Sequence, residues 1–155
     1  MTDYSFGDYE TGLLTVLQPL LAPAGPLLVL EGYAGHIRAT EFGVEVSLRG
    51  LPAVLVEIEA AEYEVIAHPY LSAQVRVTLY VAARSWRDQA EARTGEAGVY
   101  SLLADLREIL TGNTLGLEIR ACGLLPVEEK ILAGDQAQVI YTARYKFWHD
   151  RVPAG

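Results

Sequence analysis

The sequence predicts an α+β fold, a mainly antiparallel sheet with helices packed on one face. Over residues 75–83 and 139–147, apolar side chains alternate with polar ones, the period of a strand with one buried face. Between these segments, residues 99–110 carry apolar side chains at every third or fourth position, which is typical of an amphipathic helix. Successive strands grouped around one long helix indicate helices against an antiparallel sheet.

The length and charge of the chain indicate how many domains it forms and exclude some classes of partner. Its 155 residues are the size of one domain, so we expect a single α+β domain over residues 1–155, with the weakest pattern in 1–50. The net charge of −8 and the lack of a basic tract argue against specific nucleic-acid binding and against an anionic membrane surface. Three prolines interrupt the longest apolar stretch, residues 13–30, which makes a poor transmembrane helix. The acidic first ten residues do not have the form of a secretory signal.

The N-terminal half is predicted to begin with a helix and to continue as strands. Apolar residues spaced as on a helix face run from Leu13 to Leu21, and Pro19 either kinks this helix or ends it near Gln18. The short apolar run at 27–30 is predicted to be an edge strand or the start of the next element. Two further strands are predicted, one at 44–48 and a buried one at 51–59, which passes into a polar turn or an exposed strand end at 60–64.

Further elements are predicted on either side of the 99–110 helix. A charged connection of residues 85–98 precedes the helix, and its length is typical of a functional loop. After the helix, alternation over 117–121 predicts a strand, with Cys122 as a small buried side chain. A polar loop is expected to run from there to about Gln136, and the last strand to cover 137–148.

No pattern in the chain points to catalysis, a cofactor or a metal. His36, His68 and His149 stand too far apart in sequence to form a ligand pair, and surface or capping roles are expected for them. The lone Cys122 rules out an internal disulfide and a cysteine-based zinc site. The nucleophile-elbow and phosphate-loop motifs are missing from the sequence. We therefore expect no enzymatic activity and no cofactor.

Two sets of charged residues leave alternatives open. Glu57 and Glu59 point the same way on an extended strand, so they form either a hydrolase-type carboxylate pair or a solvated strand end. Arg76 and Arg144 lie on polar strand faces, where they bind an anion, an acidic patch on a neighbouring subunit, or only solvent.

Six residues are predicted to lie at a protein interface. Three belong to the long connection and are of types favoured at interface hot spots. Two are glutamates that follow the 51–59 strand, and we expect the 86–98 arm of one subunit to contact them on the next. The last is a tryptophan on the opposite strand face from its aromatic neighbours. In that order they are Trp86, Arg87, Arg93, Glu62, Glu64 and Trp148.

Three segments together resemble a known family of phage proteins. Residues 51–56 form a proline-led apolar strand, residues 98–112 open with Gly-Val-Tyr-Ser-Leu-Leu, and residues 140–145 form a tyrosine-bearing strand. In order and spacing they are similar to the Mu-like phage Gp37 family of small tail proteins. The resemblance implies a tail-terminator-like fold and a structural role with no catalytic residues.

The same resemblance implies a set of partners. The chain would form a ring with copies of itself, commonly hexameric, on the finished tail tube. Such a ring would stop growth of the tail tube protein and join the tail to the head–tail connector proteins. The expected locations are the host cytoplasm during assembly and then the virion tail. An acidic ring lumen would repel the phosphates of the DNA that passes through it.

A second class of function stays open beside this one. The chain is alternatively a small α/β regulatory domain that binds an anion or another ligand on the sheet face that carries Arg76 and Arg144. Ring formation separates the first reading from the second, whereas a ligand-dependent rise in melting temperature favours the second.

Overall fold

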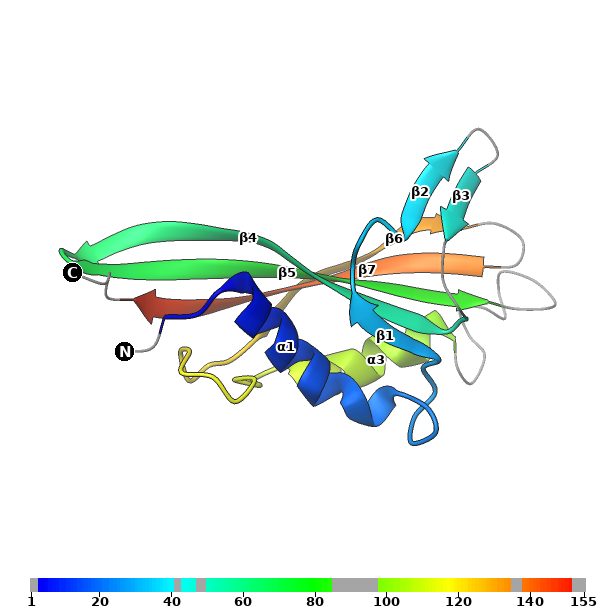
Figure 1. The fold of residues 1–155 in the computed structure, drawn as a ribbon, viewed down its shortest axis with the longest axis horizontal. Coiled ribbons are helices and arrows are strands. Elements are labelled where there is room, and N and C mark those ends of the chain that lie inside the picture. Colours follow the sequence, from blue (N-terminus) through cyan, green and yellow to red (C-terminus); the bar gives the residue numbers. More distant parts are fainter. Residues whose placement is uncertain (1–2, 41–42, 47–49, 85–97, 135–137, 152–155) are drawn as a thin grey trace.

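A computed structural model describes residues 3–40, 43–46, 50–84, 98–134 and 138–151. Its elements lie as Figure 1 shows. In chain order they are α1 (Phe6–Leu17), a 3₁₀ helix (Gln18–Leu20), β1 (Val29–Gly32), β2 (Ile37–Thr40), β3 (Gly43–Val46), β4 (Ala53–Ala67), β5 (Tyr70–Arg84), α3 (Val99–Leu110), β6 (Leu125–Gly134) and β7 (Gln138–Arg151).

The main sheet has five strands in the order β1-β4-β5-β7-β6. The β1–β4 pair is parallel, and the other three pairs are antiparallel. Both described helices cover one face of this sheet, where their buried side chains join those of β4, β5 and β7 in one core cluster (Figure 1). The predicted α+β fold is therefore confirmed.

The first helix begins at Phe6, seven residues before the predicted stripe. Ser5 caps it, because its hydroxyl accepts a hydrogen bond from the Asp8 backbone N–H while the Asp8 carboxylate accepts one from the Ser5 N–H. The α-helix ends at Leu17, and Pro19 lies in the 3₁₀ helix that follows, where its missing N–H costs no α-helical bond. Of the two predicted outcomes at Pro19, the helix end is the one observed.

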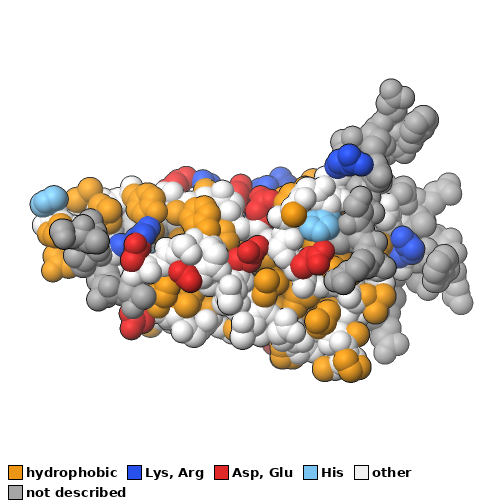
Figure 2. All heavy atoms as spheres, viewed as in Figure 1, with side chains coloured by type: hydrophobic (Ala, Val, Ile, Leu, Met, Phe, Trp, Pro, Cys, Tyr) orange, Lys and Arg blue, Asp and Glu red, His pale blue; other side chains and the backbone are white. Residues whose placement is uncertain are grey.

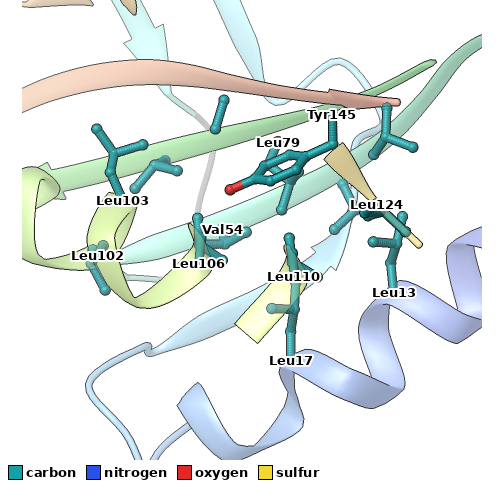
Figure 3. Packing of buried hydrophobic residues seen from close by; sticks show 14 of the residues in the cluster. Leu13, Leu17, Val54, Leu79, Leu102, Leu103, Leu106, Leu110, Leu124 and Tyr145 are labelled. Atoms are coloured by element: carbon teal, nitrogen blue, oxygen red, sulfur yellow. The ribbon is translucent and has the colours of Figure 1, made fainter. Parts of the chain in front are cut away.

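The second helix packs its apolar stripe on the sheet as predicted. Residues 99–110 form α3, and Leu103 and Leu106 are buried. Figure 3 shows Leu106 of α3 next to Val54 and on the side of the Tyr145 hydroxyl, with Leu13 and Leu17 of α1 pointing up into the same core. The alternating residues of β5 supply the floor of this core, and all five of its predicted inward side chains are at most 1% exposed: Val75, Val77, Leu79, Val81 and Ala83.

The segment after α3 differs from the prediction. Residues 111–124 form turns and no strand, and Cys122 is exposed in one of these turns. Positive φ angles at Gly112, Leu115, Gly116 and Gly123 turn the backbone on both sides of residues 117–121. Leu117 and Ile119 still pack partly against the core, whereas Ala121 is exposed. The alternation therefore indicated partial burial and not a strand.

The predicted polar loop before the last strand is a strand, β6. It pairs antiparallel with β7 and has register shifts at 126/128 and 131/133. An edge strand with bulges does not alternate in sequence, which explains why Glu128-Glu129-Lys130 read as a loop.

The strand predicted to end near residue 59 continues to Ala67. With β5 it forms a hairpin that projects past the ends of both helices, on the left of Figure 1. Residues 60–64 are thus an exposed strand, the second of the two predicted alternatives. In the weakly patterned N-terminal region, β1 is the predicted edge strand, and β2 and β3 pair antiparallel with each other where one strand was expected.

Candidate functional site

Three of the six predicted interface residues meet on the sheet face opposite the helices. Glu62 on β4 and Trp148 on β7 flank Gln74 of β5 in one cross-strand row. Glu64 lies opposite Ser72 in the next row. Together with Tyr63 these residues line a hollow of about 260 Å³ near the projecting end of the hairpin. The other three, Trp86, Arg87 and Arg93, lie outside the described residues.

Trp148 lies between two cations at this hollow. The Lys146 ammonium is 5.2 Å from the ring centroid, and the Arg120 guanidinium is 5.9 Å from it. Arg120 also donates to Ser72 Oγ and to the Asp150 carboxylate, at 2.9 and 2.8 Å. The bond from Arg120 lowers the pKa of Asp150, because it stabilises the ionised carboxylate. These contacts fix the positions of Trp148, Arg120 and Asp150 beside the hollow.

The proposed anion site is occupied by the chain's own carboxylates. Arg76 pairs with Glu62 at 2.5 Å. Arg144 pairs with Glu128 at 3.2 Å and lies 3.9 Å from Glu59. Both arginines line a second, smaller hollow of about 140 Å³ on this face. An anion would have to displace these carboxylates, so the geometry does not favour the anion-binding alternative.

The two glutamates considered as a hydrolase pair line different hollows. Glu57 lines a hollow between β4 and α1, together with Phe6 and Tyr33. Its pKa is raised by burial and then by the charge of Glu59. Glu59 lies by the smaller hollow, where it accepts a hydrogen bond from the Thr78 hydroxyl at 2.9 Å. The two carboxylates therefore share no described cavity in which one substrate would reach both.

His149 is fully buried, which corrects the expected surface or capping role. Its Nδ1 is 3.1 Å from the Tyr9 hydroxyl, and its ring is 4.9 Å from that of Tyr4. Burial raises the pKa of Tyr9 to about 12. The contact between α1 and the end of β7 joins residues that are 140 positions apart, and no local pattern could have indicated it.

Two tyrosine substitutions compare a buried hydroxyl that is hydrogen-bonded, that of Tyr9, with a buried hydroxyl that is not, that of Tyr145. Tyr9→Phe removes the bond to His149 and is expected to lower the free energy of unfolding by about 1–3 kcal/mol. Tyr145 is equally buried, but its hydroxyl has no hydrogen-bond partner among the described residues. Tyr145→Phe should therefore leave that free energy unchanged or raise it by up to about 1 kcal/mol. Urea unfolding measures both, and equal losses in the two variants would contradict the assignment.

The described residues contain neither a metal cluster nor a membrane-spanning helix. No group of three or more His, Cys, Asp or Glu side chains within them is placed to hold a metal ion. None of their helices is long and apolar enough to cross a membrane.

Two free strand edges are the feature that the sequence prediction missed. Among the described residues, β1 pairs with β4 only over residues 53–56 and no strand pairs with the outer side of β4 residues 57–67; β6, which β3 approaches, is the opposite edge of the sheet. Large apolar side chains that are 47–63% exposed follow both edges. They are Tyr63, Val65 and Ile66 on β4 and Val127, Ile131 and Leu132 on β6. The apolar residues within 127–132 were the available signal for a strand there.

Sequence comparison gives one informative result. A family model described as "Bacteriophage Mu, Gp37" matches residues 9–147, which run from within α1 to within β7. No curated protein matches the chain.

Proposed function

The chain belongs to the bacteriophage Mu Gp37 family, and from this premise we propose that it is a tail terminator. In this role copies of the chain form a ring on the finished tail tube, stop its growth and offer a surface to the head connector. The observation that carries the proposal is the extent of the family match, because residues 9–147 include all of α3 and of strands β1, β4, β5 and β6, and most of α1 and β7.

The form of the sheet supports an assembly role. A ring needs two different surfaces on each subunit, so that every contact joins one surface to the other on the next copy. The β4 edge and the β6 edge lie on opposite sides of one sheet and provide two such surfaces. Their exposed apolar side chains are typical of surfaces that a partner covers.

The partners follow from this role. They are further copies of the chain in a ring of six, the tail tube protein below it and the connector proteins above it. We place Glu62, Glu64 and Trp148 among the contact residues, together with Trp86, Arg87 and Arg93 of the long connection. Assembly takes place in the host cytoplasm, and the protein remains in the virion tail.

Inactivating the gene in a phage that encodes this chain tests the proposal. Without a terminator, tube growth has no stop, so we expect tails of irregular and excessive length that do not join heads. The wild-type gene supplied from a plasmid should restore uniform, joined tails, whereas the Leu106→Ala gene should restore them poorly because its product is less stable. Electron micrographs give the length distribution. Tails of normal length on heads in the absence of the gene would contradict the proposal.

A further inference from the structure

Apolar exposure in this chain is concentrated on the two free strand edges. Among the described residues, six of the ten large hydrophobic side chains that are exposed lie on β4 residues 57–67 or on β6. Figure 2 shows part of this surface as apolar side chains gathered on the projecting end of the hairpin, at the left. Single exposed apolar residues are common on protein surfaces. An unpaired strand edge with apolar side chains also exposes backbone N–H and C=O groups, and an added strand would cover both.

We propose that β4 residues 57–67 of one subunit pair with β6 of a second copy, so that the sheet continues from subunit to subunit. The two edges are suited to each other because they lie on opposite sides of the same sheet and both carry exposed apolar side chains. The contact joins unlike surfaces, so each subunit has one β4 edge and one β6 edge to offer. Such a contact repeats, and it closes into a ring when the rotation per subunit permits.

The irregularities of both strands restrict where they pair. Register shifts divide β4 at 58/60 and 65/67, and β6 at 126/128 and 131/133. Between these shifts, residues 60–65 and 128–131 are regular and can form an uninterrupted ladder. Bulges of this kind prevent indiscriminate pairing of long edges. The contact is therefore short and depends on the apolar side chains beside it.

Charge makes the contact weak at low salt. The free part of β4 carries Glu57, Glu59, Glu62 and Glu64, and β6 carries Glu128 and Glu129 beside Lys130. Three of these six carboxylates each pair with a different arginine within the subunit, which leaves the two edges together with an excess of negative charge. Two edges with an excess of carboxylates repel each other across a few ångströms. Added salt shortens the screening length from about 10 Å at 0.1 M to about 3 Å at 1 M, so association should strengthen as salt is added. An interface held by ion pairs would respond in the opposite direction.

Complementary variants test the pairing in solution. Val65→Lys places a charge on the β4 edge, and Ile131→Lys places one on the β6 edge. Leu28→Lys is the matched control, because Leu28 is as exposed but lies outside both edges. Sedimentation velocity over a range of protein and salt concentrations gives the masses of the species present.

The wild type and Leu28→Lys should associate increasingly with protein concentration and with salt. Each edge variant alone should remain a monomer. An equimolar mixture of Val65→Lys and Ile131→Lys should form dimers and nothing larger, because the intact β6 of the first pairs with the intact β4 edge of the second. Since both positions are exposed, circular dichroism should give unchanged melting temperatures, and Val65→Thr with Ile131→Thr serves as a second pair if a lysine variant unfolds.

A wild type that stays monomeric under all these conditions, edge variants that associate like the wild type, or a mixture that forms no dimer would each overturn the inference. Ring closure rests on the proposed function, but the two fail separately. If Val65→Lys still limits tail length, the edge contact is wrong and the terminator role stands. If the mixture forms dimers but loss of the gene leaves tails unchanged, the contact stands and the terminator role is wrong.

Discussion

Replacing Leu106 by alanine is expected to lower the free energy of unfolding by about 2–5 kcal/mol, a large fraction of the roughly 5–15 kcal/mol that stabilises a typical domain. Leu106 is fully buried and points from the middle of α3 into the core between the helix and the sheet (Figure 3). Truncation removes its contacts with both layers and leaves a cavity that the surrounding helices and strands can only partly fill.

Urea unfolding with an unchanged denaturant slope measures this loss. Ser101→Ala is the matched control, since Ser101 lies on the exposed side of the same helix and its change should stay within about 0.5 kcal/mol. A loss at Leu106 no larger than the loss at Ser101 would mean that α3 does not pack on the sheet as described.

Replacing Gly123 by alanine is expected to cost about 3 kcal/mol or more, from backbone strain and from overpacking together. Gly123 has a φ of +64°, and an added Cβ would lie 2.4 Å from the carbonyl carbon of Gly112. That atom belongs to the backbone, so no side-chain rotation relieves the contact. The change would separate the two ends of the 111–124 segment, which the bond from Gly112 N–H to the Leu124 carbonyl now joins at 2.8 Å.

Gly116→Ala isolates the strain from the overpacking. Gly116 has a similar φ of +69° in the same segment, but nothing lies within 4 Å of its added Cβ. Its cost should therefore be limited to the left-handed conformation, about 1–2 kcal/mol. Thermal unfolding should place the melting temperature of Gly123→Ala well below that of Gly116→Ala. Equal melting temperatures would show that Gly112 and Gly123 are not in close contact.

Regular, half-buried elements were predictable from this sequence. The 99–110 helix matches α3 residue for residue, and β5 buries the side chains that its alternation assigns to the core. Each of these elements buries one side and leaves the other polar. The spacing of its apolar residues therefore shows directly whether it is a helix or a strand.

Elements whose position depends on contacts distant in sequence were not predictable. In residues 111–124 the backbone turns at left-handed positions, one of which is Leu115, a residue type that gives no sign of a positive φ. β6 is exposed on an edge and broken by bulges, so it carries no clean alternation. His149 is buried because Tyr4 and Tyr9 of the N-terminal segment pack on it from the other end of the chain.

The residues of the candidate site were predictable from the sequence, but their arrangement was not, because it depends on contacts between strands that are distant in sequence. Glu62, Glu64 and Trp148 share one hollow because β5 lies between β4 and β7, an order that no local pattern states. The free edge of β4 follows from the shortness of β1, which pairs with β4 over four residues only. The family match, over residues 9–147, adds that the chain is a phage protein, which the geometry of this surface does not indicate.

The measurement that tests the terminator role most directly is the length of tail tubes grown in vitro. Purified tube protein from the same phage is allowed to polymerise with the wild-type chain, with Gly123→Ala, or alone, and tube lengths are counted in electron micrographs. With the wild type we expect growth to stop, tubes to shorten as the chain is added at higher concentration, and one end of each tube to carry a ring. Tubes of the same length in all three reactions, with no ring at either end, would contradict the terminator role.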